Sequence, residues 1–357
     1  MGVILAILHK FPSIGKYSTF ISSLRDFFDY HQLPYPVVKL RGTVKLHGCN
    51  CAMILEKGED DLSIQGRESL LSASFDNYDF YKFAMRNKAV FNDMLRELHQ
   101  RYPQKAAVVY GEWAGGEIQR KVAVSKLEKQ FFVFAIRLTD LVDKSLPEEE
   151  INRIQSKDVW LLDDELETFL GKYRAELNVF GVHSINEFPA YEIDCDLNHP
   201  DLILEKLSEL TYQVEQQCPV AKAFGAEGVG EGIVWHCVSE MPVARNVMER
   251  LSFKVKGAKH ASVKTKKIIE LDLEVTQSVA DMADLIATEN RMEQGLFQLK
   301  QGDYEPTVAD QKAFTQWIVK DCLKEESDRI LTSGLEASKV AQKIAVKAKA
   351  WFMAKMA

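Results

Sequence analysis

The spacing of hydrophobic and polar positions changes along the chain, from a pattern rich in strand-like runs to a purely helical one. In the first part, short β-like runs dominate, separated by polar turns such as 58–61. The runs that predict strands are Val37–Leu40, Cys51–Leu55, Leu62–Gly66, Ala106–Tyr110, Phe131–Ile136, Gly232–Cys237 and Leu251–Val255. Helical spacing predicts helices at 18–31, 76–99, 164–177 and 201–216. Because strands and helices do not alternate regularly, the pattern favours a sheet-rich α+β domain.

The pattern changes near residue 257. From Ile268 onward strand signals disappear, and apolar spacing predicts helices at 276–299, 308–326 and 335–356. The stretch between the two parts, 254–267, holds six lysines and no acidic residue. We therefore expect one domain at 1–262 and a small all-helical domain at 263–357.

Composition and charge narrow the class of protein. The 357 residues are 46% hydrophobic and 27% charged, which is typical of a soluble globular protein and excludes collagen, wholesale disorder and a disulfide miniprotein. No apolar stretch approaches the ~20 residues of a membrane helix. The six cysteines show no C-x-x-C pair, so we expect reduced thiols in the cytoplasm, or in the host cytoplasm if the source is viral.

The net charge of −7 is unevenly distributed. Residues 140–230 hold 7 basic and 20 acidic residues, whereas the rest of the chain holds 38 and 32. The acidic stretch contains none of the candidate site residues below. The distribution therefore allows a polyanionic partner that binds away from 140–230, in a salt-sensitive manner.

Lys45 is the first candidate for chemistry. It precedes His47, Gly48 and Asn50 in a predicted strand–turn–strand, where a turn can present the amine to a ligand. A lysine acts as a nucleophile only when it is uncharged. Taken alone, an exposed lysine in an ordinary turn is the favoured interpretation.

Further candidates lie at the ends of other predicted strands. Glu112 sits among glycines after an apolar run, and a carboxylate there can accept hydrogen bonds from ribose or from metal-bound water. Phe134 lies in an aromatic strand that can stack on a base. Glu231 precedes Gly-Ile-Val, and Lys254 and Lys256 share one strand face as a phosphate clamp. Taken alone, Glu112 can be the end of a strand in a glycine turn, core packing is the favoured interpretation of Phe134, and Lys254 and Lys256 can belong to a solvated edge strand.

The order of these fragments is more specific than any one of them. K-x-H-G, G-E, an aromatic strand, E-G-x-V and K-x-K together resemble the covalent nucleotidyltransferase superfamily of polynucleotide ligases and mRNA capping enzymes. The K-x-H-G form, GEWAGGEIQRKV at 111–122 and FFVFAI at 131–136 are most similar to the RNA ligase 2 family, which includes phage nick-sealing ligases and trypanosome RNA-editing ligases. The resemblance runs from about residue 37 to about residue 330.

The resemblance implies a fold and an activity. The fold is an antiparallel-sheet nucleotidyltransferase domain followed by a helical domain. The activity is ATP-dependent sealing of 3′-OH/5′-phosphate breaks in duplexed or structured RNA, through lysyl-AMP and an AMP-capped RNA end. Its cofactors are ATP and Mg²⁺, for which Mn²⁺ can substitute. The expected partners are RNA and ATP, and no membrane is expected to bind. We expect the protein to be a monomer.

Roles for individual residues follow from the same resemblance. Lys45 attacks the α-phosphorus of ATP, and Lys254 and Lys256 hold the α-phosphate. Glu231 orders hydrated Mg²⁺, and Glu112 contacts the ribose or the metal's waters.

Three more residues are assigned to the nucleotide, two to RNA, and one to either of them. Phe134 covers the adenine, and His47 and Asn50 belong to the nucleotide site. Arg67 binds a phosphate of the nucleotide or of the nicked end. Arg291 and Asp321 support nick sealing, although an Arg and an Asp on amphipathic helices are more often surface residues.

The last helix could bind RNA phosphates or be a solvated face. Its lysines are Lys339, Lys343, Lys347, Lys349 and Lys355.

Two positions depart from the family pattern, and rival functions stay open. Ala135 stands where the family usually has aspartate, and Val44 stands where glutamate is common. A DNA ligase or capping enzyme is expected to carry strands after Lys256, where this chain predicts helices. A nucleic-acid end-binding protein with a degenerate site is the alternative outside the enzymes.

Overall fold

The chain divides into two compact units, Met1–Gly257 and Ala258–Ala357. The computed structural model describes residues 8–116, 118–119, 122–140, 154, 157–239, 251–257, 279–300, 304–327, 330, 333 and 335–356. The predicted domain boundary at 262/263 lies outside the described residues.

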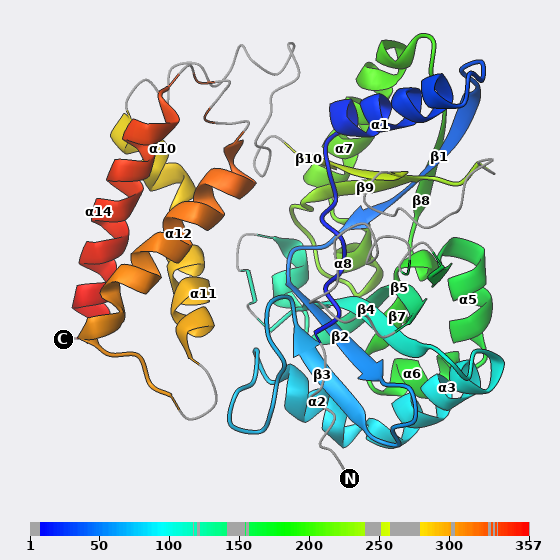
Figure 1. The fold of residues 1–357 in the computed structure, drawn as a ribbon, viewed down its shortest axis with the longest axis horizontal. Helices are drawn as coiled ribbons and strands as arrows, with labels where there is room; N and C mark the ends of the chain where they lie inside the picture. The colour runs from blue at the N-terminus through cyan, green and yellow to red at the C-terminus, as the bar shows by residue number, and fades with distance from the viewer. Residues whose placement is uncertain are drawn as a thin grey trace. The chain divides into compact units, whose positions relative to one another are not determined.

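The first unit is built around two β-sheets (Figure 1). Its strands are β1 (Val37–Lys45), β2 (Cys49–Leu55), β3 (Leu62–Gly66), β4 (Ala106–Ala114), β5 (Gln130–Thr139), β6 (Val159–Leu161), β7 (Val182–Ser184), β8 (Ala190–Asp196), β9 (Gly232–Cys237) and β10 (Ser252–Lys256). One sheet has the order β10-β9-β1-β8, and the other has β3-β2-β4-β5-β6 with β7 beside β5. All of these pairings are antiparallel except β5 with β7, which confirms the predicted antiparallel α+β fold.

Helices flank both sheets. Those of the first unit are α1 (Tyr17–Tyr30), α2 (Phe80–Arg86), α3 (Lys88–Arg101), α5 (Asp163–Gly171), α6 (Arg174–Val179), α7 (Leu204–Gln216) and α8 (Pro219–Ala223). The helix predicted at 76–99 is two helices, α2 and α3, which meet at Asn87.

Strand β1 shows how alternation creates two different sheet faces. Val38, Leu40 and Val44 are buried in the core that packs on α1 and α7. The intervening positions, which include Arg41 and Lys45, point to the opposite face. The polar face of the four-stranded sheet is therefore set by the two-residue period of the sequence.

The six-stranded sheet carries apolar clusters on both faces. On one face, α2 packs against it, and the ring centroids of Phe80 and Phe131 lie 4.9 Å apart. The other face carries Tyr110, Ala135 and Trp160 in a second cluster. The pairing of β4 with β5 shifts register at one point, because Tyr110 opposes Ala135 while Gly111 opposes Val133. Phe134 is the extra residue of this β-bulge.

The described part of the second unit is helical. It contains α10 (Val279–Ile286), α11 (Glu289–Leu299), α12 (Gln311–Glu325) and α14 (Ala337–Met356). Their apolar faces bury a shared core that includes Phe314, Ile318, Val340 and Phe352. The predicted helix at 276–299 is interrupted at Thr288, which caps α11 with an extended backbone. Within the described residues, no helix has both the length and the apolar character needed to cross a membrane.

Candidate functional site

Strand register places two of the candidate lysines on either side of the same glycine. Lys45 on β1 pairs with Gly232 on β9, and Gly232 pairs in turn with Lys256 on β10. Glu231 directly precedes Gly232, so its carboxylate enters between the two lysines. Gly232 has φ +151°, and a Cβ there would lie 2.2 Å from the Val255 carbonyl oxygen. The close strand approach at this point therefore requires glycine.

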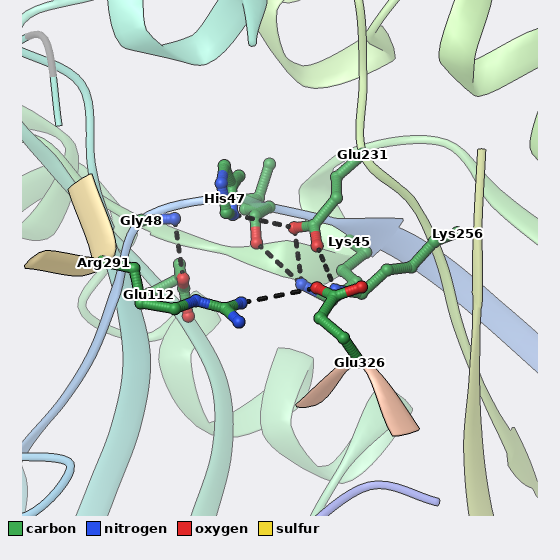
Figure 2. A network of polar contacts seen from close by, with 9 residues as sticks. Lys45, His47, Gly48, Glu112, Glu231, Lys256, Arg291 and Glu326 are labelled. Carbon is green, nitrogen blue, oxygen red and sulfur yellow. Dashed lines mark hydrogen bonds and ion pairs between the residues drawn. The ribbon is translucent and has the colours of Figure 1, made fainter. Parts of the chain in front are cut away.

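Glu231 is the centre of a charged cluster (Figure 2). Lys45 Nζ donates to Glu231 Oε2 at 2.5 Å, and Lys256 Nζ lies 3.3 Å from Oε1. His47 Nδ1 lies 3.3 Å from Oε2. Lys45 also donates weakly to the Leu46 carbonyl at 3.4 Å. The structure thus brings together four residues from two distant stretches of the sequence, 45–47 and 231–256.

The electrostatics of Glu231 follow from burial and contact. Its side chain is only 2% exposed, whereas Lys45 and Lys256 keep 20% and 22% of theirs exposed. Burial disfavours the charged carboxylate, but the positive groups that contact it outweigh this penalty. As a result the pKa of Glu231 lies well below its ordinary value. The depressed pKa favours the anionic form of Glu231, which contacts Lys45 and Lys256.

Glu112 anchors the turn that follows Lys45. Its Oε1 accepts a hydrogen bond from the Gly48 backbone N–H at 2.8 Å. A Cβ at Gly48 would lie 2.3 Å from the Trp113 carbonyl oxygen, so the turn passes too close to β4 for a side chain. Burial raises the pKa of the Glu112 carboxyl, although Lys45 and the Gly48 N–H partly offset this effect. The site therefore raises the pKa of Glu112 and lowers the pKa of Glu231.

Asn50 lies beside Glu112. The two residues face each other across β2 and β4. Asn50 Oδ1 is buried and has no hydrogen-bond partner within the part of the chain that the structure describes. A buried acceptor without a partner leaves room for a ligand donor.

Three more candidates of the first unit lie on strands or directly after one. Lys254 shares a face of β10 with Lys256, because the alternate residue Phe253 is fully buried in the core. Arg67 follows β3 with its side chain 53% exposed, 3.7 Å from Glu68. Phe134 occupies the bulge of β5 and is partly exposed.

Arg291 and Asp321 come together in the second unit. Arg291 Nε lies 3.4 Å from Asp321 Oδ2, and Nη2 lies 3.4 Å from Glu326 Oε1. The Arg291 side chain is only 18% exposed. Arg291 therefore links α11 to α12 and to the residue that follows α12 within this unit.

Several lysines of α14 pair with acidic residues of their own unit. Lys339 contacts Glu336, Lys347 contacts Asp284, and Lys355 contacts Glu293 at 2.7 Å. These pairs agree with a solvated helix face.

The site offers carboxylates rather than a metal cage. Among the described residues, no group of three or more His, Cys, Asp or Glu side chains could hold a metal ion. Glu231 and Glu112 are the acidic groups beside Lys45. One or two protein carboxylates are enough for a hard cation that keeps most of its water ligands and also binds substrate phosphates.

Sequence reasoning missed Phe11, which contacts the candidate Phe134. The ring of Phe11 lies 5.0 Å from that of Phe134. Phe11 lies outside every motif and every predicted element. Its proximity arises from the folded chain path, for which the sequence holds no local signal.

Solved structures similar to this chain include RNA ligases of Naegleria gruberi. The enzyme solved with pyrophosphate is 20% identical at a TM-score of 0.43, and the match covers 72% of this chain and 60% of that one. A variant solved with AMP and Mn is 19% identical at a TM-score of 0.44, with 70% and 56% covered. This chain thus spans less than two thirds of those proteins. No curated protein matches it.

A family model supplies the assignment. The model described as RNA ligase matches residues 39–256, which is more than half of the chain. The matched stretch begins in β1 and ends at Lys256, so it contains the whole Glu231 cluster and Glu112. The chain belongs to the RNA ligase family.

Proposed function

We propose that this protein is an ATP-dependent RNA ligase that seals 3′-OH/5′-phosphate breaks in duplexed or structured RNA through a lysyl-AMP intermediate. The observation that carries the proposal is the contact of Lys45 and Lys256 with one buried carboxylate, Glu231. This arrangement provides a nucleophile, a cationic phosphate ligand and an acidic group within a few ångströms of one another.

The first step requires a neutral Lys45. In the present contact Lys45 Nζ donates to Glu231, and before Nζ can attack it must pass a proton to water. The new N–P bond forms at the α-phosphorus as the bond to pyrophosphate breaks. Lys256 and Lys254 would neutralise the charge on the α-phosphate oxygens during this exchange.

The donor set fits a hydrated divalent cation. Mg²⁺ in phosphoryl transfer is bound through one or two carboxylates, substrate phosphates and water. Glu231 would hold it, and Glu112 would act through water; Mn²⁺ suits the same oxygen ligands. When bound, the ion neutralises phosphate charge. Glu231 is well suited to this role because its low pKa keeps it charged.

Base and sugar recognition would fall to residues beside the cluster. Phe134 would stack on the adenine, and His47 and Asn50 would line the nucleotide site. The unpartnered Asn50 Oδ1 supports this role. Val44 is buried in the core, so only its main chain could contact the base. Ala135 packs among apolar residues and supplies no carboxylate there.

The later steps would transfer AMP to the RNA 5′-phosphate and release it as the 3′-OH attacks. Arg67, with its exposed side chain, would bind a phosphate of ATP or RNA. Arg291 and Asp321 would support the sealing step from the second unit. Because Arg291 is largely buried, we propose that it positions Asp321 rather than binding RNA by itself.

Nick sealing tests the proposal. The substrate is a nicked duplex with a labelled 5′-phosphate, and its 3′-OH strand ends in either ribose or deoxyribose. Wild-type protein with ATP and Mg²⁺ should join the ribose-ended strand, and Lys45→Ala should not. Lys39→Ala is the matched control, because Lys39 is an exposed lysine on the same strand and face. Equal sealing of both sugars would contradict an RNA ligase, and activity with GTP alone would indicate a capping-type enzyme.

A further inference from the structure

Residues 8–16, here called the N-terminal strap, connect the two sheets of the first unit. At its start, the His9 N–H donates to Gln65 Oε1 at 2.8 Å, and Gln65 Nε2 donates to the His9 carbonyl at 2.7 Å. His9 Nε2 also lies 2.9 Å from Glu56 Oε1. Gln65 belongs to β3, so these bonds fasten the strap to the six-stranded sheet.

The other end of the strap joins the four-stranded sheet. Gly15 forms a parallel bridge with Phe253, and the Lys254 N–H donates to the Gly15 carbonyl at 3.1 Å. Figure 1 shows this stretch in dark blue, running from the six-stranded sheet to α1. The strap therefore touches the strand that carries the two clamp lysines.

Between these ends, Phe11 packs into an aromatic cluster. Its ring centroid lies 5.0 Å from Phe134, 5.1 Å from Tyr110 and 5.8 Å from Trp160. All three contacts are edge-to-face, and the Phe11 and Phe134 planes meet at 74°. Such pairs stabilise a defined ring orientation beyond simple burial.

Phe134 is in particular need of such support. As the extra residue of a β-bulge it has no cross-strand partner on β4, so ladder pairing does not orient its side chain. Its neighbour Ala135 has only a methyl group to pack beside it. Phe134 packs against both core clusters, and Phe11, whose segment is fastened at both ends, adds an edge-to-face contact to its ring.

Building on the proposed function, we propose that Phe11 is a positioning residue for the base site. It holds the Phe134 ring in the orientation that stacks on the purine of ATP, and the two ends of the strap fix Phe11 between the two sheets. The N-terminal strap is therefore part of the nucleotide site, although Phe11 takes no part in the transfer of AMP.

The test is the kinetics of lysine adenylylation at varied ATP concentration. Phe11→Ala should raise the KM for ATP about three- to tenfold, the range expected for losing an edge-to-face aromatic contact. Its kcat should change little, because Lys45 and Glu231 are untouched. Phe11→Tyr keeps the ring and should resemble wild type, whereas Phe11→Leu keeps apolar volume without the ring and should raise KM as Phe11→Ala does.

A merely structural role for Phe11 predicts a different result. Loss of folded protein lowers the active fraction and hence kcat, while KM stays constant. Phe27→Leu is the matched control: Phe27 is partly buried in α1 and contacts Phe28 and His31, so its loss should leave KM unchanged. An unchanged KM in both Phe11→Ala and Phe11→Leu would overturn this inference alone. Failure of wild-type protein to form any AMP adduct would overturn the proposed function as well.

Discussion

Lys45 and Glu231 form a 2.5 Å contact although 186 residues separate them in the sequence. The contact exists because β1 and β9 are neighbours in the four-stranded sheet, with Lys45 opposite Gly232. Burying Glu231 would be unfavourable without its cationic neighbours. The stability of this part of the fold and its chemistry therefore depend on the same ion pair.

Replacing Glu231 should reduce stability in a pH-dependent way. Because the folded-state pKa of Glu231 is depressed, its charge stabilises the fold above the unfolded-state pKa, and this contribution is lost as pH falls through the folded-state value. Glu231→Gln should cost about 1–3 kcal/mol near neutral pH. Urea unfolding over a pH series checks this. A difference from wild type that does not shrink in acid would contradict it.

Glu112 should give the opposite pH signature. Its folded-state pKa is raised, so ionisation disfavours the fold, and this penalty appears as pH rises through the unfolded-state pKa. Glu112→Gln retains an acceptor for the Gly48 N–H and should gain stability relative to wild type as pH rises. The same unfolding series measures it. We expect lysine adenylylation to fall nonetheless, and unchanged activity would argue against a role for the carboxylate.

The turn after Lys45 should not tolerate a side chain at Gly48. The added Cβ of Gly48→Ala would meet the Trp113 carbonyl, so we expect a loss of about 1–3 kcal/mol and weaker adenylylation. Gly171→Ala is the control, since nothing lies within 4 Å of that Cβ at the end of α5. Thermal unfolding of both variants compares them. Equal stability of Gly48→Ala and Gly171→Ala would contradict this prediction, because it would show that the turn can move to accommodate the Cβ.

The second unit should depend on Arg291 for stability. Arg291→Ala leaves Asp321 and Glu326 without their cation, and we expect a loss of about 2 kcal/mol in unfolding free energy. Lys355→Ala removes a more exposed ion pair with Glu293 and should change stability much less than Arg291→Ala does. Sealing by Arg291→Ala should fall more than adenylylation does. An equal loss of sealing and of adenylylation would contradict the proposed role of Arg291 in nick sealing.

Residue patterns predicted the fold class and most element positions, but not the contacts that make the site. Apolar alternation located most of the strands, although β1 extends beyond the predicted Val37–Leu40 to Lys45. That extension matters, because it places Lys45 in register with Gly232. Apolar spacing does not predict the breaks at Asn87 and Thr288, because it continues across them. Such interruptions depend on local backbone geometry more than on periodicity.

The candidate site was predictable where residue order carries information. Lys45, Glu112, Glu231 and Lys256 were all singled out in the sequence, and the structure gathers them around one turn and one carboxylate. The contact of Phe11 with Phe134 was not predictable. It depends on a tertiary path and a β-bulge, and neither leaves a pattern of residue types.

The covalent adduct is the most direct test of the central claim. Wild-type protein is incubated with ATP labelled at the α-phosphate and Mg²⁺, then denatured and digested, and the labelled peptide is identified by mass spectrometry. We predict AMP attached to Lys45, release of the label by pyrophosphate, no label on Lys45→Ala and full label on Lys39→Ala. Label that persists on Lys45→Ala, or that maps to another residue of the wild-type protein, would contradict the account.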